Sequence, residues 1–121
     1  MIKIEAEPSR NLLSVIYCGD VVPEEIEEIT PDFKAALGLM EPGFRLLTDL
    51  GGLESMSASC APFIEKFMDM INAKAVAMVV RIVPDPKKDI GFQVMSYFHY
   101  RPEVGIVTVE TAAEAMAALA D

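Results

Sequence analysis

The residues with the clearest chemical potential lie in the segment FRLLTDLGGLESMSASCAPFIEKF, residues 44–67, where an apolar stretch is followed by serines and a cysteine. The hydroxyl and thiol groups belong to Ser55, Ser57, Ser59 and Cys60. They come just before an amphipathic pattern that predicts a helix. A helix start offers unbonded backbone N–H groups and the positive end of the helix dipole, both of which stabilise a phosphate. A phosphorylation switch is therefore one interpretation of this segment.

Helix capping is the alternative role for the same serines. Proline is well tolerated only in the first turn of a helix, so Pro62 indicates that the helix begins just before it. The cap is expected near Ser59, with Ser57 as the competing choice, because a serine hydroxyl accepts a hydrogen bond from a free backbone N–H. On position alone, capping and modification both remain open for Ser59.

Catalytic roles have less support. Asp49, Ser59 and His99 are the residue types of a hydrolytic triad, but the G-x-S-x-G pattern of a nucleophile elbow is absent. Cys60 could have a lowered thiol pKa near the helix start and sense oxidation. It also shares an apolar helical stripe with Ile64, which favours a small buried residue. We therefore expect no enzymatic activity.

Cofactor and metal sites are not expected either. The chain has one histidine, and Cys18 and Cys60 lack the spacing of metal ligands. Gly51 and Gly52 do not belong to a dinucleotide or P-loop motif.

The charge balance restricts the partners. Nineteen acidic and ten basic residues give a net charge of −9, which repels phosphate backbones and argues against nucleic acid. The acidic run Glu24–Glu28 is expected to form a solvated helix face, and could alternatively attract a basic partner protein.

The hydropathy pattern indicates a globular chain. Hydrophobic residues make up 52% of the sequence, but the apolar run at Ala75–Val80 is too short to span a bilayer. The first ten residues lack the features of a signal peptide. Two unpaired cysteines suit a reducing compartment. A cytoplasmic protein without membrane insertion is expected.

The N-terminal half predicts a hairpin, a helix and a strand. Residues 2–7 and 12–18 have strand patterns separated by the turn PSRN. Apolar residues at helical spacing follow between Val22 and Met40, where Pro31 predicts either a kink or two helices, the second capped by Thr30. Residues 44–50 form the next predicted strand, buried on both faces, and the segment 49–59 is expected to be a loop.

The C-terminal half alternates helices and strands. A helix is predicted after Cys60, a central strand at 75–83, and a helix opening at Asp85 and Pro86. Residues 104–109 form the last predicted strand. Thr111 and Glu114 then make a capping box for the final helix.

These patterns predict one α/β domain over residues 1–121 with the element order β-β-α-β-α-β-α-β-α. Such alternation after an initial hairpin predicts a mixed, mostly parallel sheet with right-handed crossovers. Functional loops of such sheets gather at the carboxyl ends of the strands, and the segment 49–59 leaves one of these ends.

The stretch GFRLLTDLGGLESMSASC, residues 43–60, resembles the signature region of the STAS domain, the fold of bacterial anti-sigma-factor antagonists. The chain resembles most the small stand-alone SpoIIAA-like branch. In these antagonists a motif Asp-Ser-Ser/Thr-Gly carries the hydroxyl that a partner kinase phosphorylates. By this resemblance the phospho-acceptor is Ser59, whereas Ser57, Ala58 and Cys60 replace the aspartate, the first hydroxyl and the glycine.

The resemblance implies a non-enzymatic regulatory module that binds a partner protein, such as an anti-sigma-factor-like kinase. The expected contacts are in the loop, at Glu54, Ser55, Ser57 and Cys60. An alternative is a carrier of a small apolar ligand or lipid, since the branch is sometimes grouped with CRAL-TRIO domains. The candidate pocket residues are Phe92, Met95 and Phe98. A homodimer formed through a strand edge or an apolar helix face is a third hypothesis.

Overall fold

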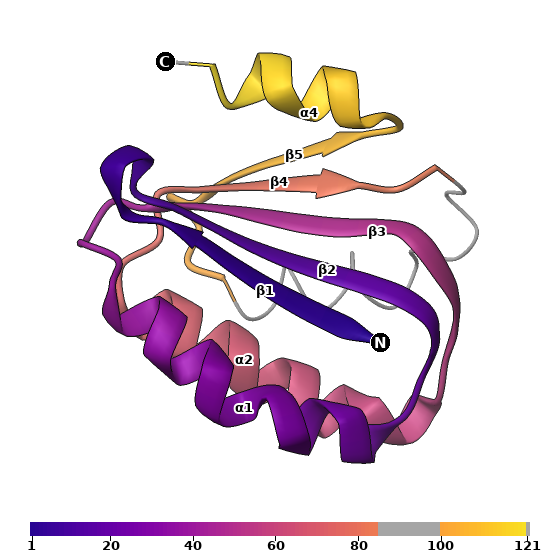
Figure 1. Cartoon of the computed structure of the whole chain (residues 1–121). Coiled ribbons are helices and arrows are strands. Elements are labelled where there is room, and N and C mark those ends of the chain that lie inside the picture. The colour runs from indigo at the N-terminus through magenta and orange to yellow at the C-terminus, as the bar shows by residue number, and fades with distance from the viewer. Residues whose placement is uncertain (85–99, 121) are drawn as a thin grey trace.

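The computed structural model of the protein describes residues 1–84 and 100–120, which form a five-stranded mixed sheet (Figure 1). The strands lie side by side in chain order: β1 (Ile2–Glu7), β2 (Leu12–Val21), β3 (Arg45–Met56), β4 (Met78–Ile82) and β5 (Gly105–Val109). β1 pairs antiparallel with β2, and the three other pairs are parallel. The predicted α/β fold with a mixed, mostly parallel sheet is confirmed.

The hairpin of β1 and β2 turns through a short 3-10 helix, η1 (Pro8–Arg10), and Asn11. Asn11 has a φ of 50°, a left-handed conformation that asparagine tolerates better than most residues. Its side-chain oxygen accepts a hydrogen bond from the Glu41 N–H at 2.8 Å. Both strands were predicted, but β2 continues past the predicted end at Cys18 as far as Val21.

β3 differs most from the prediction, because it continues beyond Leu50 to Met56. The predicted loop is therefore mostly strand, and Glu54 and Ser55 lie in β3 rather than in a loop. The reason is a long-range pairing: the end of β2 runs parallel to this part of β3, with register shifts on either side of Cys18 and Gly19.

Two glycines lie in crowded positions of β3, and one of them, Gly52, is paired with Cys18 of β2. The N–H of Gly51 donates to the Asp49 carboxylate at 2.8 Å, and a Cβ at Gly51 would lie 3.0 Å from the same oxygen. A Cβ at Gly52 would lie 3.1 Å from the sulfur of Cys18. Side chains at these two positions would be crowded, which is consistent with glycine at a close approach and an irregular register in the strand.

α1 (Pro23–Gly38) is one continuous helix that contains Pro31, so of the two predicted alternatives, a kink or two helices, the second is wrong. The buried face of Ile26, Phe33 and Leu37 packs on the sheet on both sides of the proline, so tertiary packing holds the helix together. The hydroxyl of Thr30 donates to the Ile26 carbonyl at 2.6 Å instead of capping a second helix.

The other described helices follow the predicted patterns. α2 (Ala61–Ala73) buries Ile64, Phe67, Met68 and Ile71. α4 (Ala112–Ala118) starts at Thr111, whose hydroxyl oxygen accepts a hydrogen bond from the Glu114 N–H at 3.2 Å. The predicted cap of the final helix is confirmed.

The sheet separates two apolar layers. α1 and α2 cover one face and α4 covers the other (Figure 1). β3 contributes Leu46 to the larger core and Leu47 to the core under α4, which confirms that this strand is buried on both faces.

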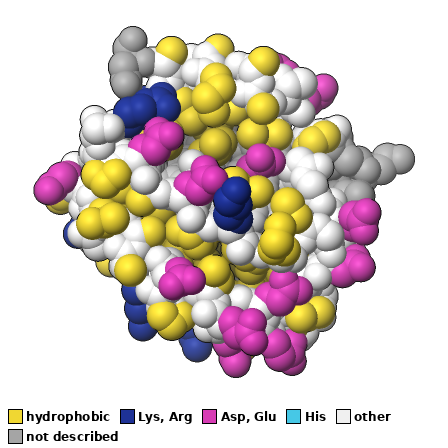
Figure 2. Space-filling view, viewed as in Figure 1, with side chains coloured by type: hydrophobic (Ala, Val, Ile, Leu, Met, Phe, Trp, Pro, Cys, Tyr) yellow, Lys and Arg dark blue, Asp and Glu magenta, His cyan; other side chains and the backbone are white. Residues whose placement is uncertain are grey.

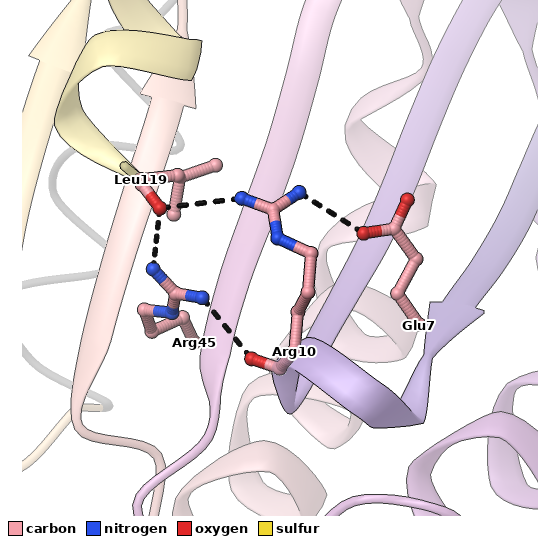
Figure 3. Close-up of polar contacts among 4 residues, drawn as sticks. All are labelled: Glu7, Arg10, Arg45 and Leu119. Carbon is pink, nitrogen blue, oxygen red and sulfur yellow. Dashed lines mark hydrogen bonds and ion pairs between the residues drawn. The ribbon is translucent and has the colours of Figure 1, made fainter. Parts of the chain in front are cut away.

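The C-terminal end of α4 is held by two arginines (Figure 3). Arg45 donates to the Leu119 carbonyl at 2.5 Å, and Arg10 donates to the same oxygen at 3.3 Å. Arg10 also pairs with Glu7 at 3.1 Å. Positive charges at a helix C-terminus complement the helix dipole, so these contacts attach α4 to the start of β2 and β3.

The central strand is shorter than predicted. β4 begins at Met78 rather than Ala75, because Ala75 has a positive φ of 64°, which an extended strand excludes. The predicted helix after Asp85 lies outside the described residues. So do His99 and the three candidate pocket residues Phe92, Met95 and Phe98.

Candidate functional site

The candidate site lies where β2 and β3 end and the helices α1 and α2 begin (right side of Figure 1). Asp20 is paired with Ser55 and Val21 with Met56 at the ends of the two strands. After Met56 the chain forms a 3-10 turn, η2 (Ala58–Cys60), which leads directly into α2. We call the three hydroxyls at this place, those of Ser55, Ser57 and Ser59, the serine cluster.

Ser57 caps the turn. Its hydroxyl oxygen accepts a hydrogen bond from the Ser59 N–H at 3.3 Å, and its own N–H donates to the Val21 carbonyl at 3.3 Å. The Cys60 N–H donates to the Ser57 carbonyl at 2.9 Å. The expected cap at Ser59 is therefore wrong; the competing choice, Ser57, caps the η2 turn, whereas the N-cap position of α2 itself is Cys60, which makes no side-chain cap bond.

Ser59 is exposed in the middle of η2, one residue before the buried Cys60. Its hydroxyl oxygen lies 2.6 Å from that of Ser57, so the two hydroxyls share one hydrogen bond. Because Ser59 does not cap α2, its hydroxyl is not required by the helix start. The side chain is exposed to solvent.

Asp20 brings a carboxylate to the serine cluster that no local motif indicated. Its Oδ1 accepts a hydrogen bond from the Ser55 hydroxyl at 2.5 Å. The two residues are 35 positions apart and meet because their strands pair at this point. The sequence Gly19-Asp20 is typical of the end of a strand. It does not show that β3 lies beside this end or that Ser55 contacts the Asp20 carboxylate.

Cys60 is buried, and its thiol donates to the Val21 carbonyl at 3.6 Å. Burial raises the pKa of this thiol, and the carboxylates of Glu24 and Glu25 raise it further, against a backbone hydrogen bond from Ser57 that lowers it. A thiol with a raised pKa forms little thiolate at neutral pH, so the environment favours a packing role over a redox role.

The same carboxylates make this end of the molecule acidic. Glu24 is exposed and Glu25 half-buried at the start of α1, and Glu54 is exposed at the end of β3. Figure 2 shows acidic side chains gathered at the lower right, where α1 begins in Figure 1. A basic surface would be attracted here, whereas an added phosphate would meet like charges.

The hypothetical triad is not supported by the positions of its described members. Asp49 and Ser59 are separated by the remainder of β3, seven residues that span roughly 20 Å at the usual strand rise. Asp49 instead accepts the Gly51 N–H within its own strand.

The cavity enclosed between α2 and the sheet is too small for a ligand. The enclosed cavity between α2 and the sheet has a volume of about 20 Å³, enough for about one water molecule. Thr48, Arg81 and the buried Tyr17 and Tyr100 contribute its polar lining. A carrier needs an apolar cavity of roughly 300 Å³ or more, so this enclosed cavity does not favour that function.

Residues 1–84 and 100–120 contain neither a membrane-spanning helix nor a metal site. No helix there is long and apolar enough to cross a bilayer. Nor do His, Cys, Asp and Glu side chains gather there in a group that could hold a metal ion.

Neither a protein-family model nor a curated protein matches the sequence. Solved structures do match. An uncharacterized protein of the DUF3478 family with a SpoIIAA-like fold, from Shewanella loihica PV-4, superposes with a TM-score of 0.73 at 23% identity, over 98% of this chain and 92% of that one.

Anti-sigma-factor antagonists match as well. Unphosphorylated SpoIIAA has a TM-score of 0.67 at 16% identity, over 98% of this chain and 96% of its own. The phosphorylated form of the Bacillus cell-fate determinant SpoIIAA has a TM-score of 0.62 at 17% identity, over 98% and 99%.

Proposed function

Because the chain has a STAS-like fold of the SpoIIAA type, we propose that it is a non-enzymatic, cytoplasmic protein-interaction module, regulated by phosphorylation of Ser59. The partner is a regulatory protein with kinase activity, as in the anti-sigma-factor antagonists that the sequence resembles. The observation that carries the proposal is the exposed Ser59 hydroxyl, which lies just before α2 and is not needed as a cap.

The structure suggests how a phosphate on Ser59 would act. The kinase would transfer the phosphoryl group of its nucleotide to the Ser59 oxygen, and the hydroxyl proton would leave. The hydrogen bond between the hydroxyls of Ser59 and Ser57 would then be altered, because a bulky dianion replaces one of them. The carboxylates of Asp20 and Glu24 lie on the strand and helix that meet at this site, and would repel the dianion.

This repulsion would make the modified surface different from the unmodified one for a partner protein. The unmodified surface presents neutral hydroxyls with an acidic rim, which favours a basic partner surface. The modified surface would carry up to two further negative charges and a displaced η2 turn. A partner that docks on η2 and α2 can therefore distinguish the two states.

The direct test is the intact mass of the protein purified gently from its own host, with fragmentation across residues 55–60. We expect a mass increase of one phosphate located on Ser59 and lost in Ser59→Ala. Ser57→Ala is the matched control, since it alters the neighbouring hydroxyl and should leave the acceptor in place. An unmodified Ser59 under all growth conditions, or a phosphate on Ser57, would contradict the proposal.

A further inference from the structure

A second surface lies on the outer side of α1 and α2, away from the serine cluster. The two helices are joined by the stacked rings of Phe33 and Phe67, with centroids 4.1 Å apart. Between the helices an open groove of about 600 Å³ remains. Phe63, Phe67 and Met70 give it an apolar floor. We call this surface the α1–α2 groove.

Four charged side chains of alternating sign border the α1–α2 groove. α1 contributes Glu27 and Lys34, and α2 contributes Lys66 and Asp69. All four are exposed. Lys66 also lies over the ring of Phe63, 5.7 Å from its centroid, so one cation already covers part of the apolar floor.

We propose that the α1–α2 groove is the interface of a symmetric homodimer. In this dimer the two-fold axis lies in the plane of the interface, at right angles to the helices. Each helix then packs on the same helix of the partner, and the two run in opposite directions. Glu27 and Lys34 lie two turns apart, about 10 Å at the helical rise. Glu27 then faces the partner's Lys34, and Lys66 faces the partner's Asp69. Opposite charges meet at each corner of the groove, while the apolar floors meet at its centre.

The charge pattern favours a second copy over a partner of a single charge sign. A strongly basic or acidic helix would place like charges on two of the four side chains. Three of the four other carboxylates of α1, those of Glu25, Glu28 and Asp32, do not oppose the dimer directly, because they line a different hollow, beside β1.

The size of the surface indicates a weak dimer. α1 has 16 residues and α2 has 13, so they are about 24 and 20 Å long, with axes roughly 10 Å apart. This footprint is at the small end of specific interfaces, which predicts a dissociation constant in roughly the micromolar range.

Sedimentation velocity of the full chain from about 5 to 500 µM covers that range. The average mass should rise from the 13.2 kDa of one chain toward twice that value. In the double variant Glu27→Lys/Asp69→Lys all four charged side chains that border the groove are positive. In the double variant Lys34→Glu/Lys66→Glu all four are negative. Each alone should associate at least tenfold more weakly, and an equimolar mixture should form a heterodimer.

The control, Glu5→Lys/Glu103→Lys, changes the net charge as much as the first variant but at exposed sites away from the groove. It should dimerise like the original chain, and circular dichroism should show that all variants are folded. A monomer at every concentration would overturn the proposal. So would a dimer that persists in both groove variants, or a mixture of the two that does not associate.

Discussion

The guanidinium of Arg45 donates to the backbone carbonyl of Leu119 at 2.5 Å, although the two residues are 74 positions apart (Figure 3). The same guanidinium donates to the Arg10 carbonyl at 3.0 Å. One side chain at the start of β3 therefore joins the end of α4 to the β1–β2 turn. The short helix α4 depends on this contact and on the buried Ala115 and Leu119 for its attachment to the sheet.

Replacing Arg45 with methionine should destabilise the protein by about 1.5–3 kcal/mol, because charge-assisted hydrogen bonds to two carbonyls are lost. Urea unfolding followed by circular dichroism measures the change in free energy. Lys3→Met is the control, since its pairing with Glu5 is exposed. Equal stabilities of the two variants would show that Arg45 does not hold α4.

Ser57→Ala should lower the free energy of unfolding by about 0.5–2 kcal/mol, the usual cost of losing a capping hydroxyl. Ser59→Ala should cost less, because it removes only the exposed hydrogen bond between the two hydroxyls. Chemical denaturation of both variants compares the two positions. A larger loss in Ser59→Ala would mean that the capping role belongs to Ser59.

The two buried tyrosines predict a loss of stability at alkaline pH. Burial raises the pKa of Tyr17, and nearby Tyr100 raises it further, while burial raises the pKa of Tyr100 against the lowering effect of Arg81. Below pH 10 both phenols are protonated whether the chain is folded or not. Above that value only the unfolded chain releases the protons, so stability falls by about 1.4 kcal/mol per tyrosine and pH unit.

Unfolding midpoints measured from about pH 8 to 11.5 test this dependence. Tyr17→Phe should show a shallower decline than the original chain above pH 10, whatever its stability at neutral pH. An unchanged slope would mean that Tyr17 ionises in the folded protein. Cys60 adds a decline that begins at lower pH, near the ordinary thiol pKa, because its own pKa is raised.

Pro31→Ala should stabilise α1. Pro31 lies inside the helix on its exposed side, where it lacks the N–H that would bond to the carbonyl of Glu27. Restoring this donor should raise the free energy of unfolding by about 1 kcal/mol or more, reduced in part by the greater freedom of the unfolded chain. Thermal unfolding measures the gain. A loss of stability would show that the Thr30–Ile26 contact depends on the proline.

The local patterns predicted most of the framework. Alternation in residues 2–7, the helical stripe after Cys60 and the capping box at Thr111 all depend on neighbours within a few positions, and each is confirmed. The resemblance of residues 43–60 to the STAS signature led to the correct fold. These elements could be predicted because strands and helices each impose their own period on the order of apolar and polar residues.

The site itself required the tertiary structure. β3 continues through Gly51 and Gly52 because β2 pairs with it, and Asp20 reaches Ser55 through that same pairing. α1 stays continuous at Pro31 because the sheet holds its buried face. Residue types and their spacing were enough to indicate the strands, the helices and a candidate hydroxyl at Ser59. Which of these residues meet could be known only from the folded chain, because contacts between distant segments depend on the packing of the whole sheet.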